Sequence, residues 1–225
     1  MVEVAPAWKS AHSGASIGVL AMHGVENPQH HPQLDEKKED LEKVLRAQYS
    51  SYDRQSLKTI PILAAYAVYY KQFNKTYHVQ HQLESVVFKN RQIPKVAALV
   101  EAMFMAELKN LMLTAGHDWS AIEGSIRIDV ASGTESYIRM DGKEQKVKAR
   151  DMMIADETDI VSCIVYGPDR RTRIRPETER VVFTVYAPPG IAENDVRLHL
   201  EDIRENVAVI TPGASVDSIE TLGTD

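Results

Sequence analysis

The spacing of apolar residues changes near Gly124, and this change limits the kinds of fold open to the chain. Before Gly124, apolar residues recur every three or four positions, as in amphipathic helices. After it, Ile126, Ile128 and Val130 alternate with polar neighbours, as in half-buried strands. Helices followed by mostly antiparallel strands predict an α+β fold. We therefore expect a single domain over 1–211, with a helical half over about 1–123 and a β-rich half over about 124–211.

Individual elements can be placed from the same patterns. Helices are predicted over 34–48, 61–73, 80–89, 96–113 and 192–207, the last one amphipathic, after a short buried strand over 15–25. Pro61 suits the first turn of its helix, and apolar residues on nearly every side of that helix predict that it is buried. Strands are predicted over 126–130, 137–138, 143–148, 152–155, 160–166 and 181–186, with Asp141-Gly142 as a hairpin turn. The polar residues 212–225 predict a flexible tail.

Composition excludes several classes of protein. Hydrophobic residues make up 44% of the 225 positions, which is ample for a core and incompatible with a disordered chain. No apolar run approaches the roughly 20 residues that cross a bilayer, and residues 1–10 lack the basic start of a secretory signal. The single cysteine excludes a disulfide scaffold, so we expect a cytoplasmic protein without a membrane partner.

Charge argues against a protein that coats nucleic acid. With 26 basic and 32 acidic side chains the formal charge is −6, and no DNA partner is expected. Two local segments are basic, and arginine forks suit phosphate groups. The first segment carries Lys146 and Lys148, and the second carries Arg170, Arg171, Arg173 and Arg175. They predict a local, salt-sensitive contact with RNA; the alternative interpretation is a solvated, salt-bridged surface.

Sequence motifs for several common chemistries are missing. There is no Walker loop, no Gly-x-Gly-x-x-Gly after a strand and no Gly-x-Ser-x-Gly elbow, so neither a nucleotide cofactor nor a serine hydrolase is predicted. His78 and His81 have a helical spacing but no third ligand nearby, and no metal site or other cofactor is expected. Cys163, in the middle of a predicted strand, is interpreted as a small buried apolar side chain.

The segment 114–119 is the one that core building explains least. It joins the predicted 96–113 helix to the first strand of the sheet, and its Gly116 would let a ligand approach the backbone closely. Asp118 is expected to cap the turn that runs through Ser120. For His117 the sequence leaves a structural role and a functional role open.

Several short stretches, taken in order and spacing, resemble one family. They are 69–73 (Tyr-Tyr-Lys-Gln-Phe), 83–85 (Leu-Glu-Ser), 89–94, 99–101 and above all 118–124 (Asp-Trp-Ser-Ala-Ile-Glu-Gly), followed by Asp141-Gly142, Ala155-Asp156 and Glu177-Thr178. In this arrangement the chain resembles the B3/B4 domain of the phenylalanyl-tRNA synthetase β chain, the editing domain of that enzyme, and small stand-alone bacterial proteins built on it. The resemblance implies a B3/B4-like fold, with N-terminal helices packed on a mostly antiparallel sheet or sandwich and a C-terminal amphipathic helix.

The resemblance also implies a pocket that holds the amino acid of a mischarged tRNA while its ester is hydrolysed. The family's polar pocket residues are not retained at the matching positions. Its histidine corresponds to Ala115, its tyrosine-reading glutamate to Thr184, its Thr-Asn pair to Met103 and Phe104, and the basic residue before that helix to Pro94. Losing hydrogen-bonding groups for a substrate hydroxyl costs on the order of 10⁴ in discrimination, so tyrosine-specific editing is not expected.

Other residues are candidates for the same cavity. His117 and Glu107 are the catalytic candidates, and the predicted substrate pocket comprises Phe104, Ala115, Gly116, His117, Tyr166 and Thr184. Two functions follow from this interpretation. One is a free-standing aminoacyl-tRNA deacylase, or another tRNA-associated factor, that contacts the acceptor end of tRNA. The alternative is a non-catalytic protein that binds an amino-acid-like small molecule on the same fold.

Overall fold

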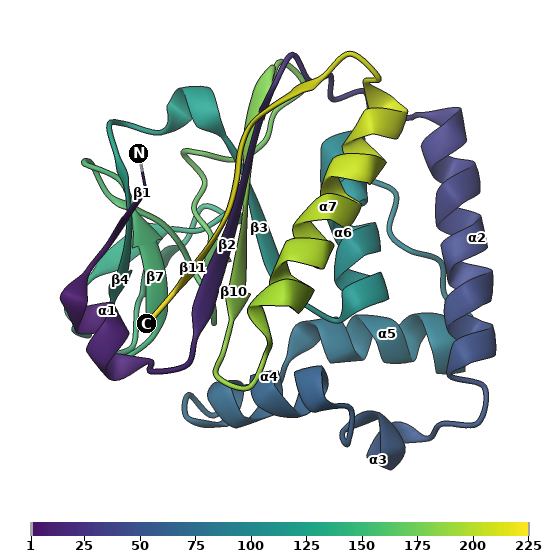
Figure 1. Cartoon of the computed structure of the whole chain (residues 1–225), viewed down its shortest axis with the longest axis horizontal. Coiled ribbons are helices and arrows are strands. Elements are labelled where there is room, and N and C mark those ends of the chain that lie inside the picture. Colours follow the sequence, from purple (N-terminus) through teal and green to yellow (C-terminus); the bar gives the residue numbers. More distant parts are fainter. Residues whose placement is uncertain (1, 225) are drawn as a thin grey trace.

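The structure, a computed structural model, describes residues 2–224, which form three layers (Figure 1). A five-stranded sheet packs on one face of a four-stranded sheet, and helices cover the other face. The helices are α1 (Pro6–Ala11), α2 (Pro32–Gln48), α3 (Arg54–Leu57), α4 (Pro61–Lys71), α5 (His78–Lys89), α6 (Ala98–Asn110) and α7 (Glu193–Ile210), with a 3₁₀ turn at Trp119–Ala121. The strands are β1 (Val2–Val4), β2 (Ser16–His23), β3 (Thr114–Asp118), β4 (Ile126–Val130), β5 (Ser136–Ile138), β6 (Glu144–Lys146), β7 (Met152–Ala155), β8 (Ile160–Cys163), β9 (Gly167–Pro168), β10 (Arg180–Ala187) and β11 (Ser215–Gly223).

The four-stranded sheet is antiparallel throughout, in the order β11-β2-β10-β3. α6 and α7 lie on one face of it, and β2 brings Gly18 under α7, where an added Cβ would lie 2.6 Å from Cγ1 of Val196. Glycine at this position therefore sets how closely α7 approaches the sheet. β3 is an outer strand, so one of its edges has no strand partner within this sheet.

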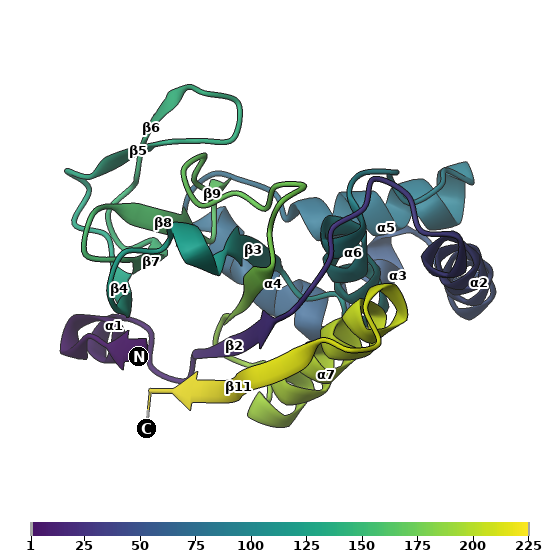
Figure 2. The same ribbon diagram turned by 90° about the horizontal axis from the view of Figure 1, so that it is seen from above.

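The five-stranded sheet has the order β1-β4-β7-β8-β9, and its pairs are antiparallel except β1 with β4. At the interface between the two sheets, the hydroxyl oxygens of Tyr186 on β10 and Ser162 on β8 lie 2.5 Å apart. β5 and β6 form a separate hairpin around Asp141-Gly142, which projects from the rest of the molecule (Figure 2). Gly142 has a φ of +81°, a conformation that favours glycine in this turn.

The remaining helices are tied to the sheets and to one another by buried polar groups. The Tyr66 hydroxyl of α4 donates to the backbone carbonyl of Tyr186, and the Tyr70 hydroxyl donates to that of Ile164, so α4 is fixed to both sheets. On the other side, the Lys38 ammonium of α2 is buried 2.5 Å from the Glu101 carboxylate of α6. Within residues 2–224, none of the helices is both long and apolar enough to cross a lipid bilayer.

The predicted fold class is confirmed. The molecule is α+β, and most of its helices and strands lie within a few residues of the predicted positions. Pro61 opens α4, and Asp141-Gly142 forms the hairpin turn, both as predicted. The predicted burial of the 61–73 helix is only half right, because Tyr66 is fully buried whereas Val68 is 67% exposed.

Two predictions along the chain are wrong. The segment 114–118 is not a connection to the sheet but strand β3, which pairs with β10. The predicted flexible tail over 212–225 is wrong for residues 215–223, which form β11 and pair with β2; residue 225 lies outside the described residues. The outer edge of the buried strand β2 needs hydrogen-bond partners, and a polar, half-exposed strand supplies them. A strand of that kind has too few apolar residues for its pattern to be visible in the sequence.

Candidate functional site

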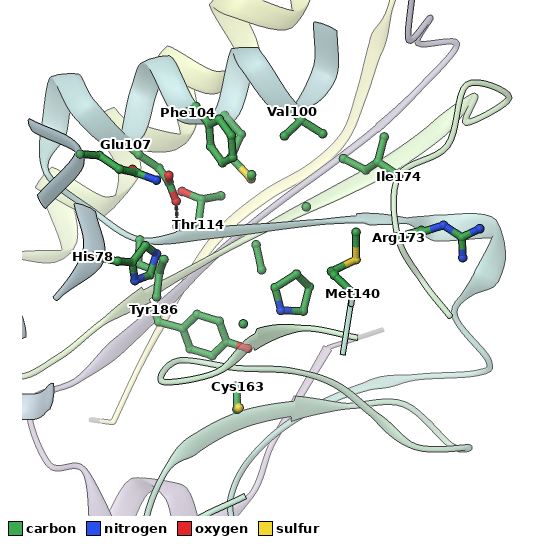
Figure 3. Close-up of a pocket in the computed structure, with 17 residues that line it drawn as sticks. His78, Val100, Phe104, Glu107, Thr114, Met140, Cys163, Arg173, Ile174 and Tyr186 are labelled. Atoms are coloured by element: carbon green, nitrogen blue, oxygen red, sulfur yellow. Dashed lines mark hydrogen bonds between the residues drawn. The ribbon is translucent and has the colours of Figure 1, made fainter. Parts of the chain in front are cut away.

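A cavity of about 360 Å³ lies against the outer edge of β3, and we call it the β3-edge cavity (Figure 3). Its lining is mostly apolar and comes from α5, α6, β3, β10, the end of β8 with β9, and the segments around 140 and 173. The lining residues are His78, Gln82, Val100, Met103, Phe104, Glu107, Leu113, Thr114, Ala115, Gly116, Met140, Cys163, Gly167, Pro168, Arg173, Ile174 and Tyr186. A largely apolar pocket with a few polar groups is typical of a small-molecule or substrate site.

The outer edge of β3 bridges to Arg173 at His117 and brings one further backbone donor, the N–H of Gly116, to this cavity. The N–H of Thr114 donates to Oε1 of Glu107 at 2.7 Å, and the N–H of Asp118 donates to the carbonyl of Thr172 at 2.7 Å. Both donors point away from β10. Because N–H groups alternate in direction along a strand, the N–H of Gly116, midway between them, points to the same side. A backbone donor on a cavity wall suits a carbonyl or carboxylate oxygen of a ligand.

Glu107 contributes a carboxyl group to the cavity wall. The residue is 2% exposed, and burial raises the pKa of its carboxyl to about 8, although the hydrogen bond from Thr114 favours the ionised form. At pH 7 the group is therefore mainly a neutral acid, which both donates and accepts hydrogen bonds.

Tyr186 and Cys163 line another part of the cavity. Burial raises the pKa of the Tyr186 hydroxyl well above its usual value. Burial also raises the pKa of the Cys163 thiol, and the nearby Asp151 carboxyl acts in the same direction. The thiolate, not the thiol, is the nucleophile. This wall therefore contributes shape and weak hydrogen bonding rather than a covalent catalyst.

The permanent charge on the cavity wall is that of Arg173. This side chain lies at the far end of the cavity from Glu107 (Figure 3), and its Nη1 donates to the carbonyl of Arg170 at 2.8 Å. On the α5 side, burial lowers the pKa of His78, so its imidazole is mainly neutral at pH 7. The cavity thus has a neutral acid in its wall at one end and the side chain of Arg173 at the other, whose guanidinium points away from the other lining residues (Figure 3).

The structure brings part of the predicted pocket together. Three of its residues, Phe104, Ala115 and Gly116, line the cavity, as does the catalytic candidate Glu107. Thr184 does not, because its hydroxyl donates to the backbone carbonyl of Ala115, its register partner on β3, at 3.4 Å. Tyr166 does not either; its ring lies under the ammonium of Lys75, 5.8 Å from the ring centroid.

His117 is not among the residues that line the cavity. It is fully buried, and its Nδ1 lies 2.8 Å from the hydroxyl of Thr172, which in turn donates to Asp169. Nδ1 therefore carries the proton and donates to Thr172. Burial, together with the nearby charge of Arg171, lowers the pKa of His117 to about 3, so the imidazole is neutral. β3 continues as a strand through this residue, so the His117 side chain is held against the 169–172 loop. Of the two roles that the sequence leaves open for His117, this position favours the structural one.

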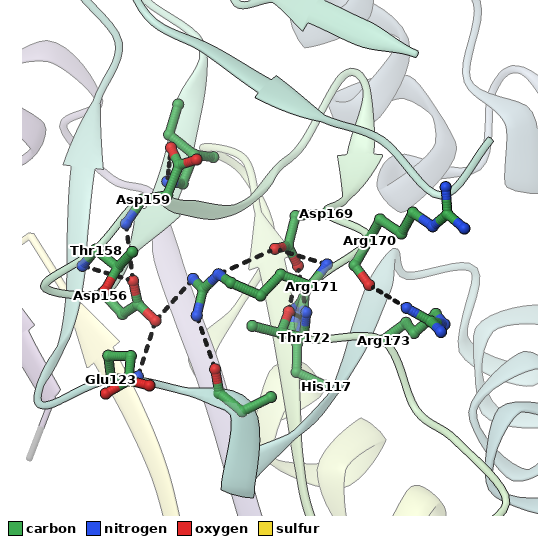
Figure 4. A network of polar contacts seen from close by, with 12 residues as sticks. His117, Glu123, Asp156, Thr158, Asp159, Asp169, Arg170, Arg171, Thr172 and Arg173 are labelled. Carbon is green, nitrogen blue, oxygen red and sulfur yellow. Dashed lines mark hydrogen bonds and ion pairs between the residues drawn. The ribbon is translucent and has the colours of Figure 1, made fainter. Parts of the chain in front are cut away.

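Two arginines of the predicted RNA-binding set are bound to acids of this chain, and Figure 4 shows the contacts of the first, Arg171. Arg171 donates to Oδ2 of Asp156 at 2.8 Å and to the carbonyl of Ala121 at 2.7 Å. Arg175 donates to Oδ2 of Asp118 at 3.0 Å. These guanidinium groups hold the loop after β9 against the rest of the molecule, so the salt-bridged interpretation describes this part of the segment.

The other basic residues of that set differ in how free they are. The ammonium of Lys148 donates to the backbone carbonyl of Phe73 at 3.0 Å. The side chain of Arg173 lines the cavity, and its Nη1 donates to the backbone carbonyl of Arg170. Arg170 and Lys146 are exposed and form no ion pair among the described residues 2–224. Of the six residues predicted to contact RNA, these two are exposed cations without an ion pair in the described part of the chain.

Several lining residues were not predicted from the sequence. Tyr186 lies two positions after the candidate Thr184. Because side chains two apart in a strand share a face, the sequence does indicate Tyr186 as a further pocket residue. Gln82 follows His78 by one helical turn of α5. Met140 comes from the β5–β6 hairpin, and nothing in the sequence near it points to a cavity. Cys163 is buried as predicted but also lines the cavity.

The predicted cap and the histidine pair have clear positions in the structure. Asp118 accepts a hydrogen bond from the N–H of Ser120 at 2.9 Å and caps the 3₁₀ turn, as predicted. His81 lies on α5, where its Nε2 is 3.1 Å from the hydroxyl of Thr76. Over residues 2–224, no three His, Cys, Asp or Glu side chains are grouped so that they would hold a metal ion.

Comparison with known proteins relates this site to a described domain. A model of the B3/4 domain matches residues 63–205, a range that contains the whole lining of the β3-edge cavity. The phenylalanine–tRNA ligase beta subunit of Mycoplasma pneumoniae is 25% identical over 96 residues, and that of Mycoplasma genitalium is 28% identical over 69 residues. These alignments span 43% and 31% of this chain but only 12% and 9% of those proteins.

A solved structure extends the similarity to nearly the whole chain. The crystal structure of an N-terminal fragment of the phenylalanyl-tRNA synthetase beta subunit from Pyrococcus horikoshii superposes with a TM-score of 0.51 at 12% sequence identity. The superposition covers 98% of this chain and 53% of that fragment, and at this identity it shows the fold alone. Because the domain model matches well over half of the residues, this chain belongs to the B3/4 domain family.

Proposed function

We propose that this protein acts on aminoacylated tRNA: it binds the aminoacyl group in the β3-edge cavity and hydrolyses the ester that joins this group to the RNA. The observation that carries the proposal is the cavity itself, a mostly apolar space with the neutral acid Glu107 in its wall, inside the segment that matches the B3/4 domain. The similarity to two tRNA ligase beta subunits supports a role connected with tRNA.

The reaction adds water across the ester. The water oxygen bonds to the carbonyl carbon, the bond to the ribose oxygen breaks, and one proton of the water ends on that oxygen. The carbonyl oxygen gains negative charge on the way, and the N–H of Gly116 on the outer edge of β3 would stabilise it. Glu107, neutral at pH 7, would act as a hydrogen-bond donor to the substrate rather than as a general base. Holding the ester and the water next to each other in the cavity lowers the activation barrier further, because the two reactants no longer have to meet by diffusion.

The lining favours an aminoacyl side chain that is largely apolar. Met103, Phe104 and Ile174 border the space that this side chain would occupy, and burying a charged group among them is unfavourable. The position that corresponds to the tyrosine-reading glutamate of the editing domain is Thr184, whose hydroxyl is bonded to the backbone of β3. Tyrosine specificity by that route is therefore not part of the proposal.

A panel of tRNAs, each charged with a different amino acid, tests the proposal. We expect the protein to release at least one amino acid about tenfold faster than spontaneous hydrolysis, which corresponds to ~1.4 kcal/mol of barrier. Val100→Phe, which narrows the cavity from α6, should abolish most of this acceleration. The matched variant Val68→Phe adds the same bulk on the exposed side of α4 and should keep it. Rates equal to the spontaneous ones for every member of the panel would overturn the proposed hydrolysis.

A second candidate function is binding of an amino-acid-like small molecule without chemistry. It is favoured by the protonation state of the lining, since Glu107 is a neutral acid and Cys163 a neutral thiol, and neither is a ready base or nucleophile at pH 7. A thermal-shift screen with amino acids and their amides tests it, because a ligand at 100 times its Kd stabilises the folded state by about 2.7 kcal/mol. Binding with a flat deacylation panel would select this function over the first.

A further inference from the structure

A second hollow, of about 460 Å³, lies between α3, α4 and α5 and is lined by cations; we call it the basic hollow. Arg54 and Lys58 come from α3 and the residue after it, and Lys71 and Lys75 come from the end of α4 and the loop that follows. The carboxylate among its lining residues is that of Glu84 on α5. Four cations against one carboxylate make this a positive site on a chain whose formal charge is −6.

The cations of the basic hollow are only partly used by the fold. Nε of Arg54 is 3.4 Å from Glu84, whose Oε1 also accepts from Gln80 at 2.9 Å. Among the described residues 2–224, Lys58 and Lys71 are exposed and form no ion pair. In contrast, the guanidinium groups of Arg171 and Arg175 form ion pairs with acidic side chains of this chain. Two ammonium groups facing one hollow are therefore free to bind an anion.

The basic hollow is linked to the β3-edge cavity by a third hollow along α5. A hollow of about 440 Å³ lies between them: it shares His78, Gln82 and Phe104 with the cavity, and it shares His81 with the basic hollow. Its further lining includes the polar side chains of Ser85, Arg91 and Gln92. A ligand that extends out of the apolar cavity across α5 therefore meets these polar groups, with Arg91 among them, and beyond His81 it meets the cluster of four cations.

We propose that the RNA strand that carries the aminoacyl group leaves the β3-edge cavity across α5, and that its phosphates bind in the basic hollow to Lys58 and Lys71. This inference rests on the proposed function and names its RNA-binding surface, which differs from the arginine segment 170–175. A linear polyanion joined to an amino acid is the ligand that matches an apolar cavity, a polar passage and a cluster of cations in that order. Lysine contacts to phosphates give affinity without base specificity.

Two double variants of equal charge change test the inference. Lys58→Gln with Lys71→Gln removes two exposed lysines of the basic hollow, and Lys146→Gln with Arg170→Gln removes one exposed cation of the hairpin and one of the 170–175 segment. Binding of deacylated tRNA to the full chain is measured between 50 and 200 mM salt. We expect the first variant to bind about five- to tenfold more weakly at 50 mM and to lower the slope of log K against log salt by about 1.4, since each phosphate contact on a single strand contributes about 0.7. The second variant should bind like the wild type.

The outcomes that overturn the inference are distinct from failure of the proposed function. Equal losses in both variants would indicate bulk charge, and a loss confined to K146Q/R170Q would move the RNA contact to the hairpin; either result refutes the basic hollow. Hydrolysis of an aminoacyl ester of adenosine, which lacks the preceding phosphates, should be unchanged in K58Q/K71Q, and this also shows that the variant is folded. If tRNA binding depends on the two lysines but no ester is hydrolysed, the deacylase proposal fails and the RNA surface stands.

Discussion

Glu107 and Thr114 are joined by a hydrogen bond from the backbone N–H of Thr114 to Oε1 of Glu107, 2.7 Å long, which links α6 to the first residue of β3. The donor belongs to the outer edge of β3 and would otherwise be a buried N–H without a strand partner. The same contact holds a carboxyl group in the wall of the β3-edge cavity, where burial keeps it neutral. One residue thus serves both the fold and the chemistry of the cavity.

Glu107→Gln should remove a pH dependence of stability. The pKa of about 8 in the folded chain lies above the usual 4.5, so the stabilisation is complete below pH 4.5 and is lost as pH rises through 8. The variant keeps an acceptor for the Thr114 N–H but does not titrate. Between about pH 5 and 8 the wild type should lose on the order of 1 kcal/mol per pH unit relative to E107Q. Urea unfolding from pH 5 to 9 measures this difference, and parallel curves would show that the pKa is not raised.

His199→Gln should reduce the sensitivity of the fold to acid. His199 on α7 is fully buried with Nε2 2.7 Å from the hydroxyl of Thr114, and burial lowers its pKa to about 4. The unfolded chain takes up a proton below about pH 6.5 and the folded chain does not, so stability falls as pH drops from 6.5 towards 4. The difference in unfolding free energy between pH 7 and 4.5 should be smaller in H199Q. His81→Gln, on the surface of α5, serves as the control and should match the wild type.

Gly18→Ala should destabilise the protein by about 1–3 kcal/mol, the usual cost of overpacking a core. The new Cβ would lie 2.6 Å from Cγ1 of Val196 and 3.1 Å from Cδ1 of Leu200, so α7 has to shift away from β2. Gly213→Ala is the matched control, because nothing lies within 4 Å of the Cβ it adds. Chemical denaturation of both variants gives the comparison. Equal stabilities would mean that α7 accommodates the methyl group without cost.

Arg171→Met should cost about 1–3 kcal/mol of stability, because it leaves hydrogen-bonding partners of a charged group unsatisfied. The Asp156 carboxylate that it binds at 2.8 Å is fully buried, and its pKa is held below the usual value in part by this contact. Arg170→Met removes a neighbouring guanidinium that forms no ion pair within residues 2–224 and should leave the melting temperature within about 1 °C. Similar melting temperatures for R171M and R170M would contradict the structural role of Arg171.

Ending the chain after residue 211 should destabilise the fold and promote aggregation. β11 pairs with β2 along residues 16–23, and seven of the eight residues of β2 are buried. Without β11 the outer edge of β2 would be a long, apolar strand with open hydrogen-bonding groups. Light scattering and thermal unfolding measure both effects. Val216→Ser, which changes an exposed side chain of β11 but keeps its backbone pairing, should behave like the wild type.

Sequence by itself determined the features that depend on neighbouring residues. The change of period at Gly124 gave the α+β class, Asp141-Gly142 gave the hairpin turn, and Asp118 gave the cap on Ser120. Each reflects a local backbone preference, which the residue types at adjacent positions set directly. The order of short motifs also indicated the B3/4 family, because family motifs are read along the chain.

Tertiary structure alone decided which polar groups meet. It paired Arg171 with Asp156 and Arg175 with Asp118, while it gathered an arginine of α3 and lysines from the residue after α3, from α4 and from the loop after α4 into one hollow. It also held His117 away from the cavity and brought Glu107 to the edge of β3. Charge interactions and burial depend on distance through space, and a charge run looks the same in sequence whether its partners are solvent, phosphates or acids of the same chain. The β3-edge cavity and the basic hollow therefore exist only once the helices are packed on the sheets.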